Sequence, residues 1–215
     1  MTERVVRVGE IELVCADFST GGLAGDKDEL ARLLNAAVAN SWPPELLKAY
    51  FEEGHGIHDA ITESGWGIWW IVSLVDGMRT LVGHVSFDGP PEDGGVAVWC
   101  EVQPSHRRMG IASTSVRVLA EHVFENAEVG FVEAYARAGD TAAVKTAKRA
   151  GFVADGTDED GNLRFSMTRS DLQGVRARVP SSYPGHPPKN MVTRATLSGR
   201  VVSELSAGRR LPRGP

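Results

Sequence analysis

Two arginines and a glycine stand close together in the segment PSHRRMGIAS, residues 104–113. Arg107 and Arg108 supply positive charge, and Gly110 and Ala112 allow a ligand to approach the backbone closely. An apolar run precedes the segment, and a helical pattern follows it. Because the free N–H groups and the dipole of a helix N-terminus both attract anions, this arrangement predicts a phosphate site.

The segment matches neither of two common nucleotide-binding motifs. The sequence contains no G-x-x-x-x-G-K-[ST], so a P-loop is not supported, and no G-x-G-x-x-G within a strand–helix–strand unit, so a dinucleotide fold is not supported either. On its own, the segment can also be a basic helix N-terminus that contains a glycine and binds no phosphate.

Hydrophobic periodicity indicates the elements that must hold this loop. Strands are predicted within residues 5–18, 67–75, 80–89, 94–102, 129–137, 151–157 and 163–169. Helices are predicted within residues 26–51, where a second helix restarts at WPPELL, and at residues 112–126 and 140–152, the last closed by Gly151. This order predicts an α/β (α+β) fold with one domain at residues 1–170 and a basic, proline-containing extension at residues 171–215.

Composition narrows the class of protein. The chain has 215 residues, of which 42% are hydrophobic and 24% charged, so it can bury a core. No apolar run approaches the roughly 20 residues of a membrane-spanning helix, and the N-terminus lacks an apolar signal core, so we expect a cytoplasmic location and no membrane partner. The two cysteines, Cys15 and Cys100, indicate neither a disulfide framework nor a thiolate metal site.

The net charge of −5 is unevenly distributed. The tail carries Lys189 and seven arginines against Asp171 and Glu204, so the rest of the chain is strongly acidic. An acidic body argues against nucleic acid as the main partner and suits a cationic substrate, although ordinary solubilising charge explains it equally well. The basic tail either binds an acidic partner, another subunit or nucleic acid, or is disordered or loosely packed.

Three histidines are candidate functional groups. His55 and His58 in HGIH, beside Glu52 and Glu53, resemble metal ligands, but no third ligand is indicated, so we expect no metal site. His84 on a predicted strand is either a proton relay or a histidine satisfied by a neighbour.

The loop resembles the [Q/R]-x-x-G-x-[G/A] pyrophosphate loop of the GNAT acetyltransferases, matched here by the run RRMGIA at residues 107–112. Upstream, VWCEVQPSHRR is similar to the family's fourth strand, which runs into a proline. Downstream, AYARAGDTAAVKTAKRAGF is similar to its later strand and helix. The resemblance covers residues 27–169 in element order and is closest to the branch that contains the ribosomal-protein N-terminal alanine acetyltransferases. It implies a mixed, mostly antiparallel central sheet flanked by helices.

The resemblance implies acetyl-CoA as a co-substrate, with its pyrophosphate on the loop at residues 107–113. The pantetheine arm is expected to lie along the strand near Glu101, Val102 and Gln103, as an added β-strand does. Lys145, on the later helix, is also implied to contact acetyl-CoA, but it can instead be an ordinary exposed helix residue. The residues implied to contact acetyl-CoA are Val102, Gln103, Arg107, Arg108, Met109, Gly110, Ile111, Ala112, Ser113, Asp140 and Lys145.

Direct acetyl transfer to an amine needs a base, an oxyanion donor and an acid, and no protein nucleophile. Glu101 is the candidate base. The alternative interpretation is that its carboxylate only faces solvent or pairs with an arginine. A main-chain N–H near Val102 is the candidate oxyanion donor. Tyr135 is the candidate acid. The alternative interpretation is that its side chain only packs against its neighbours on a strand.

The later motif departs from the family pattern at three positions. The frequent asparagine is Asp140, the serine or alanine three residues on is Ala143, and the position that often holds a tyrosine acid is Ala147. A tyrosine acid at that last position is therefore excluded.

The sequence thus favours an acetyl-CoA-dependent N-acetyltransferase that acts on a primary amine, of a small molecule or a peptide N-terminus, by direct attack on the thioester. The departures at Asp140, Ala143 and Ala147 keep an alternative open, which is a non-catalytic GNAT-fold module that binds CoA. The acceptor is not indicated, and a homodimer is left open.

Overall fold

The structure is a computed structural model that describes residues 4–16, 26–45, 47–48, 65–75 and 77–172. Its strands are β1 (Val5–Val8), β2 (Ile11–Cys15), β3 (Ala37–Val38), β4 (Ile68–Val75), β5 (Met78–Phe87), β6 (Gly95–Val102), β7 (Phe131–Ala136), β8 (Val153–Thr157) and β9 (Leu163–Thr168). Its helices are α2 (Lys27–Leu34), α5 (Ile111–Val123), α6 (Thr141–Ala150) and α7 (Arg169–Leu172), with a 3₁₀ turn η1 (Pro104–His106).

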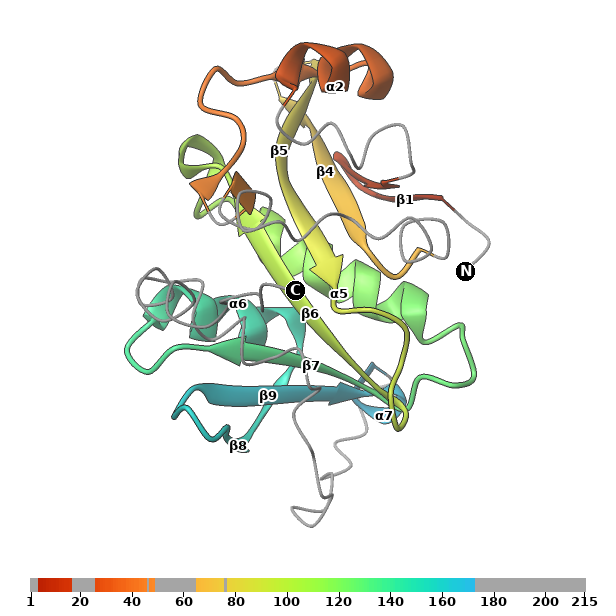
Figure 1. Ribbon diagram of the computed structural model, residues 1–215, viewed down its shortest axis with the longest axis vertical. Helices are drawn as coiled ribbons and strands as arrows, with labels where there is room; N and C mark the ends of the chain where they lie inside the picture. The colour runs from red at the N-terminus through yellow and green to blue at the C-terminus, as the bar shows by residue number, and fades with distance from the viewer. Residues whose placement is uncertain (1–3, 17–25, 46, 49–64, 76, 173–215) are drawn as a thin grey trace, which may run out of the picture.

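The described strands form one nine-stranded sheet in the order β1-β2-β4-β5-β6-β7-β9-β8, with β3 added alongside β5. Most neighbours are antiparallel, while β6 with β7 and β3 with β5 are parallel pairs. Figure 1 shows that β4 and β5 form one half of this sheet and that β7, β9 and β8 form the other, with β6 crossing between them. The α/β (α+β) class with a mixed, mostly antiparallel sheet is therefore confirmed.

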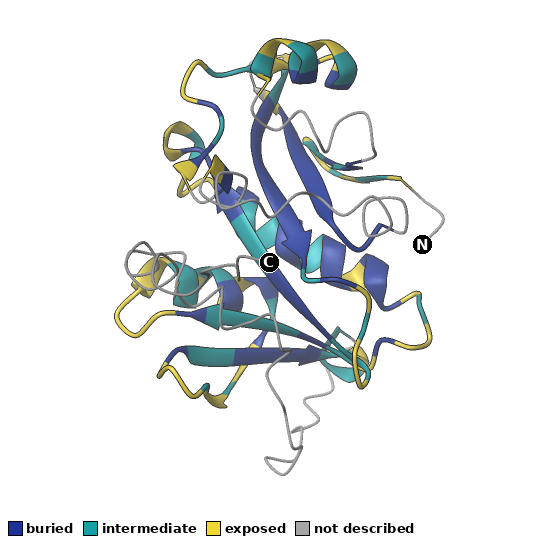
Figure 2. Cartoon of the chain, viewed as in Figure 1, coloured by how far each residue is buried: buried dark blue, intermediate teal, exposed yellow. Residues whose placement is uncertain are grey.

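Alternating side chains of the strands build two separate cores on the two faces of the sheet. Val98 and Val102 of β6 belong to the larger core, which includes apolar side chains of α5 and α6. Trp70 of β4 belongs to the smaller core with Leu30 of α2 and Leu47. The strands at the centre of the sheet are almost entirely buried (Figure 2).

The chain after α2 differs from the sequence-based prediction. Ala37 and Val38 fit the helical spacing, but α2 ends at Leu34 and these two residues form β3. Asn35 ends the helix in the left-handed conformation, with a φ of 46°, which asparagine adopts more readily than most residues. The assignment of Ala37 and Val38 to the helix was wrong because pairing with β5 outweighs their periodicity. A helical turn begins at Glu45, as the WPPELL segment predicts.

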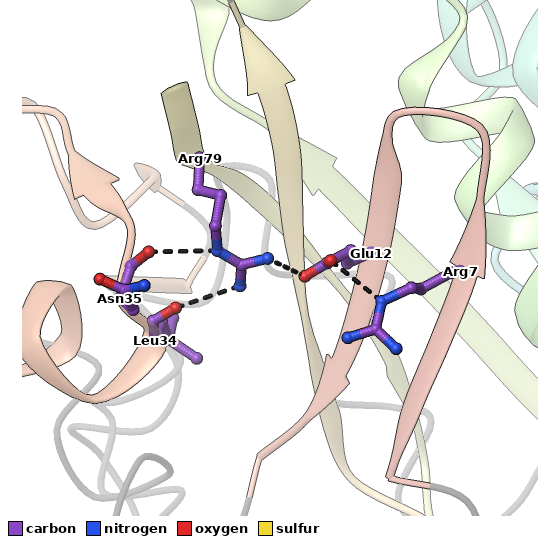
Figure 3. Close-up of polar contacts among 5 residues, drawn as sticks. All are labelled: Arg7, Glu12, Leu34, Asn35 and Arg79. Carbon is purple, nitrogen blue, oxygen red and sulfur yellow. Dashed lines mark hydrogen bonds and ion pairs between the residues drawn. The ribbon is translucent and has the colours of Figure 1, made fainter. Parts of the chain in front are cut away.

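Arg79 of β5 ties the end of α2 to the sheet (Figure 3). Its Nε donates to the carbonyl of Asn35 at 3.1 Å, and its Nη2 donates to the carbonyl of Leu34 at 3.2 Å. Its Nη1 bonds Glu12 of β2, which also accepts from Arg7. Although burial opposes the effect, these two guanidinium groups hold the pKa of Glu12 below its usual value. Arg79 thereby fixes the chain where it leaves α2 for β3.

The second half of the fold follows the predicted order. Asp140 caps α6, and Gly151 ends it with a φ of 103°, as the left-handed stop requires. The β8–β9 hairpin is also confirmed, while η1 and α7 carry no clear sequence signal. Most of the predicted extension, residues 173–215, lies outside the described residues, so the domain boundary stays a prediction.

Candidate functional site

β6 and β7 begin as a parallel pair and then run apart (Figure 1). Their pairing joins Gly95 to Phe131, Val96 to Val132 and Ala97 to Glu133. Beyond Ala97, β6 continues to Val102 and β7 to Ala136, and the described sheet has no further pairing between them. We call this divergence, between residues 98–102 and 134–136, the splay.

The edge of β6 that faces the splay carries main-chain groups from alternate residues. The N–H of Gln103 donates to the carbonyl of Val82 at 2.8 Å, and the carbonyl of Ala97 accepts from the N–H of Asp88 at 3.2 Å, so odd-numbered residues are directed toward β5. Because this direction alternates along a strand, the even-numbered residues direct their N–H and C=O groups toward the splay. These residues are Val98, Cys100 and Val102.

The loop after β6 leads into the N-terminus of α5. Arg108, with a φ of 65°, and Gly110, with a φ of 82°, both adopt the left-handed conformation, which is uncommon for an arginine. No side chain caps the first turn of α5, which starts at Ile111, and the hydroxyl of Ser113 donates to the carbonyl of Gly110 at 2.9 Å. The first main-chain N–H groups of α5 thus lie beside a basic loop, an arrangement that binds anions.

Arg107 directs its side chain back along β6. Its Nε donates to the carbonyl of Val102 at 2.9 Å, and its Nη2 lies 3.9 Å from Oε1 of Glu101. The Arg107 side chain is 56% exposed, whereas that of Glu101 is only 8% exposed. Arg107 therefore joins the loop to β6 and compensates part of the charge of a buried carboxylate.

The Glu101 carboxylate lies among groups from three parts of the chain. Its Oε2 accepts from the main-chain N–H of Leu47 at 3.4 Å and lies 3.9 Å from Nε2 of His84, while Arg107 approaches the other oxygen. The carboxylate is therefore buried and paired with arginine instead of facing solvent. Its role as a base stays a prediction.

His84 is fully buried on β5, directly opposite Glu101 in the strand register. Its ring packs edge-on against Trp99, with 4.7 Å between centroids, and its Nδ1 lies 3.4 Å from Oγ of Ser86. Nε2 makes no hydrogen bond to any described residue. Burial lowers the pKa of His84 and outweighs the opposite effect of Glu101, so the imidazole is neutral at pH 7.

Gln103 is also buried and shares the Glu101 side of β6. Its Oε1 accepts from the hydroxyl of Ser41 at 3.3 Å, and its main-chain N–H is bonded to Val82. The main-chain N–H is thus directed toward β5 and away from the splay, and the expected contact of Gln103 with acetyl-CoA stays a prediction.

Tyr135 lies on β7, and its hydroxyl donates to Oε2 of Glu133 at 2.8 Å. Burial raises the pKa of Glu133, and burial together with the Glu133 charge raises the pKa of Tyr135. Arg164 of β9, which pairs with Asp155 at 3.2 Å, faces the same carboxylate. The Tyr135 hydroxyl proton is thus engaged by Glu133, and its role as a general acid stays a prediction.

Asp140 is the N-cap of α6, and Lys145 lies in the middle of this helix. Oδ1 of Asp140 accepts from the main-chain N–H groups of Ala142 at 3.1 Å and Ala143 at 2.9 Å, which is the geometry of a helix N-cap. Lys145 is exposed on the helix. Their contacts with acetyl-CoA stay predictions, and Asp140 has a structural role in addition.

His55 and His58 lie outside the described residues. Within the described ranges, no group of three or more His, Cys, Asp or Glu side chains is placed to hold a metal ion. None of the helices found there is long and apolar enough to cross a membrane.

Sequence reasoning missed three contributors to this site. The alternation of β6 brings Cys100 into the edge that faces the splay, and the strand pattern alone would have shown this. Gly83 of β5 allows Glu101 to approach, and a glycine inside a strand signals such a contact. The N–H of Leu47 has no sequence signal, because every residue except proline has one.

Residues 19–153 match the family model described as an acetyltransferase (GNAT) domain. Because this match spans more than half of the 215 residues, it defines the class of protein as an acyltransferase. The chain belongs to the GNAT acetyltransferase family, as its loop and flanking elements indicate. No curated protein matches the chain in sequence.

Solved structures share this fold at low sequence identity. The ribosomal-protein-S5-alanine acetyltransferase from Vibrio fischeri is 12% identical, with a TM-score of 0.56 over 78% of this chain and 97% of that chain. The ribosomal L7/L12 α-N-protein acetyltransferase RimL is 16% identical, with a TM-score of 0.54 over 76% and 93%. The microcin C7 self-immunity acetyltransferase MccE, solved with acetyl-CoA and AMP, is 14% identical, with a TM-score of 0.50 over 74% and 92%. These similarities confirm the GNAT-like fold.

Proposed function

We propose that this protein is an acetyl-CoA-dependent N-acetyltransferase that acts on a primary amine. The observation that carries the proposal is the edge of β6 beyond its pairing with β7. There Cys100 and Val102 direct main-chain groups toward the splay, the Val102 carbonyl also accepts from Arg107, and the strand leads into the uncapped N-terminus of α5. Such an edge suits an extended amide chain, and such a helix end suits a pyrophosphate.

In this proposal the pyrophosphate binds the main-chain N–H groups of residues 109–113, and Arg107 and Arg108 add charge-assisted bonds. The pantetheine arm lies along β6 and hydrogen-bonds the groups of Cys100 and Val102 as a further strand would. The MccE structure contains acetyl-CoA, which supports this choice of donor.

The chemistry of transfer assigns a role to Glu101. Oε2 or Oε1 of Glu101 takes a proton from the acceptor ammonium, and the resulting neutral nitrogen attacks the thioester carbon. The carbon–sulfur bond breaks and the amide bond forms as the nitrogen releases its second proton to solvent, and CoA leaves as a thiolate that takes up a proton, for which Tyr135 is the proposed donor. The N–H of Val102 is directed toward the splay and is the proposed oxyanion donor.

The acceptor is proposed to be a peptide N-terminus or a small amine. RimL and the S5 enzyme are named for acetylation of ribosomal proteins, which supports the first class. We propose the cytoplasm as the compartment, because both cysteines are free thiols. We also propose that residues 1–170 form the complete catalytic domain, so that removing residues 173–215 leaves acetyl-CoA binding intact.

Thermal unfolding with and without acetyl-CoA tests donor binding. Gly110→Glu places a carboxylate at the proposed pyrophosphate position, and we expect it to abolish the stabilisation by acetyl-CoA. Gly77→Glu is the matched control, because Gly77 has a φ of 78° against 82° for Gly110, and a Cβ atom meets nothing within 4 Å at either position. Equal stabilisation of the two variants would contradict the assignment of the loop.

Thiol release from acetyl-CoA, measured with peptides, aminoglycosides, polyamines and amino acids, tests transfer. We expect at least one class of amine to accelerate thiol release by the wild type. The Glu101→Gln variant should not show this acceleration. Stabilisation by acetyl-CoA without release by any amine would contradict the transferase function and favour a CoA-binding module.

A further inference from the structure

The side chains of His84 and Glu101 form a buried pair whose geometry suits proton transfer. They face each other across β5 and β6, with 3.9 Å between Nε2 and Oε2, and their side chains are 0% and 8% exposed. A direct hydrogen bond requires about 3 Å, so a side-chain movement of roughly 1 Å would form it. Catalytic hydrogen bonds often shorten in this way when a substrate binds.

The surroundings of His84 are compatible with the tautomer that can accept a proton from Glu101. The hydroxyl of Ser86 lies 3.4 Å from Nδ1 and can accept the Nδ1–H. A proton on Nδ1 leaves the lone pair of Nε2 directed toward Glu101, and Nε2 has no hydrogen bond to the described residues. The edge-on contact with Trp99 holds the ring in this orientation.

We infer that His84 is the proton partner of Glu101, so that the proton removed from the acceptor amine passes to the buried imidazole. This inference rests on the proposed function, since it gives Glu101 its role as the base. It makes His84 a positioning and proton-holding residue that acts through Glu101.

The proton balance of the step is simple. The acceptor ammonium loses one proton to the Glu101 carboxylate, giving a neutral amine and a carboxylic acid. The acid then gives this proton to Nε2 of His84, giving an imidazolium beside a carboxylate. Glu101 is thereby ionised again before the amine attacks, and after transfer the imidazolium releases its proton through Glu101 to solvent.

The groups around the pair come from four parts of the chain. Arg107 approaches from the loop at 3.9 Å, and the N–H of Leu47 approaches from the segment after β3 at 3.4 Å. From β4, the uncharged Trp70 lies opposite His84 in the register. Cys100, next to Glu101 on β6, keeps its proton because burial raises the pKa of its thiol to about 12.

Histidine-selective ¹⁵N NMR tests the pair without an acceptor. In the wild type, we expect the nitrogens of His84 to titrate at a higher pH than in Glu101→Gln, because the carboxylate favours the imidazolium. Identical pH dependence of the His84 nitrogens in the two proteins would overturn the inference, whether or not the protein transfers acetyl groups.

Kinetics with His84→Gln tests the proton transfer itself. We expect kcat to fall about tenfold or more, in the range of general acid–base effects. We also expect the acid limb of the pH–rate profile to move to lower pH, because activity then no longer requires a neutral imidazole. A uniform fall in rate with an unchanged profile would indicate a merely structural histidine and would overturn the inference.

His122→Gln is the matched control, because His122 is also a buried histidine but packs edge-on against Trp69 in the other core. Its pH profile should equal that of the wild type. The experiments distinguish the two hypotheses. Absence of thiol release by the wild type contradicts the transferase function, while a His84 titration that is unchanged in Glu101→Gln contradicts only the pairing of His84 with Glu101.

Discussion

A Cβ atom placed on Gly83 would lie 2.2 Å from the main-chain oxygen of Glu101 and 3.0 Å from Cα of Val102. Both contacts are with backbone atoms, which cannot rotate away as a side chain can. Gly83 therefore permits the close approach of β5 and β6 at the point where β6 carries its candidate base.

Gly83→Ala is accordingly expected to push β6 away from β5 at Glu101. We expect the free energy of unfolding to fall by about 2 kcal/mol or more, as in overpacked cores, and thiol release to fall with it. Urea denaturation and the release assay measure the two effects. Gly130→Ala is the control, since its Cβ would lie 3.4 Å from the Gly94 oxygen. Equal stability of the two variants would contradict the close approach.

Asp140→Ala is expected to lower stability because it removes the N-cap of α6. Loss of such a cap costs about 1 kcal/mol, while Asp140→Asn keeps a capping oxygen and should cost less. Urea denaturation measures both variants. The stabilisation by acetyl-CoA then distinguishes the two roles of this residue: if Asp140→Asn loses stabilisation while keeping the cap, the carboxylate also contacts the donor.

The stability contributed by Glu12 is expected to depend on pH. Arg79 and Arg7 lower the folded pKa of Glu12, so its contribution is fully present above the unfolded value of about 4.3 and is lost as the pH falls through the folded pKa. At pH 7, Glu12→Gln should be less stable than the wild type by about 1 kcal/mol, and the difference should narrow below pH ~4.

Thermal unfolding at several pH values measures this difference. Glu29→Gln is the control, because it breaks only a local pair between Glu29 and Arg32 within α2. A difference between Glu12→Gln and the wild type that persists unchanged at low pH would contradict the ionic role of Glu12.

Cys100 is expected to react very slowly with thiol reagents in the folded protein. Burial raises the pKa of its thiol to about 12, so at pH 8 roughly one thiol in 10⁴ is ionised. Disulfide reagents should label it at a measurable rate only after unfolding in guanidinium. Rapid labelling of Cys100, which is half-buried, would contradict the raised pKa of its thiol. The practical result is a low protein background in thiol-release assays.

The sequence predicted the parts of the site that depend on local chemistry. The helix stop at Gly151 follows from its tolerance of a positive φ, and the anion-binding loop follows from the arginines and Gly110 before an apolar helical pattern. These features need only a few neighbouring residues, so a short window of sequence contains them.

Contacts between distant segments were not predictable in this way. The end of α2 at Leu34 depends on Arg79, which lies 45 residues later, and the buried state of Glu101 depends on Leu47, 54 residues earlier. Helical spacing therefore misled the assignment of Ala37 and Val38, because it contains no information on which strand is available for pairing.

The short ladder between β6 and β7 divides the sheet into two panels. Three residue pairs join the panels in the described sheet; α5 packs on the panel of β5 and β6, and α6 packs on that of β7 and β8. A donor bound along the edge of β6 beyond this ladder would add contacts between the two panels. The molecule that supplies the acetyl group would then also stiffen the frame against which the acceptor is recognised, which favours binding of the donor before the acceptor.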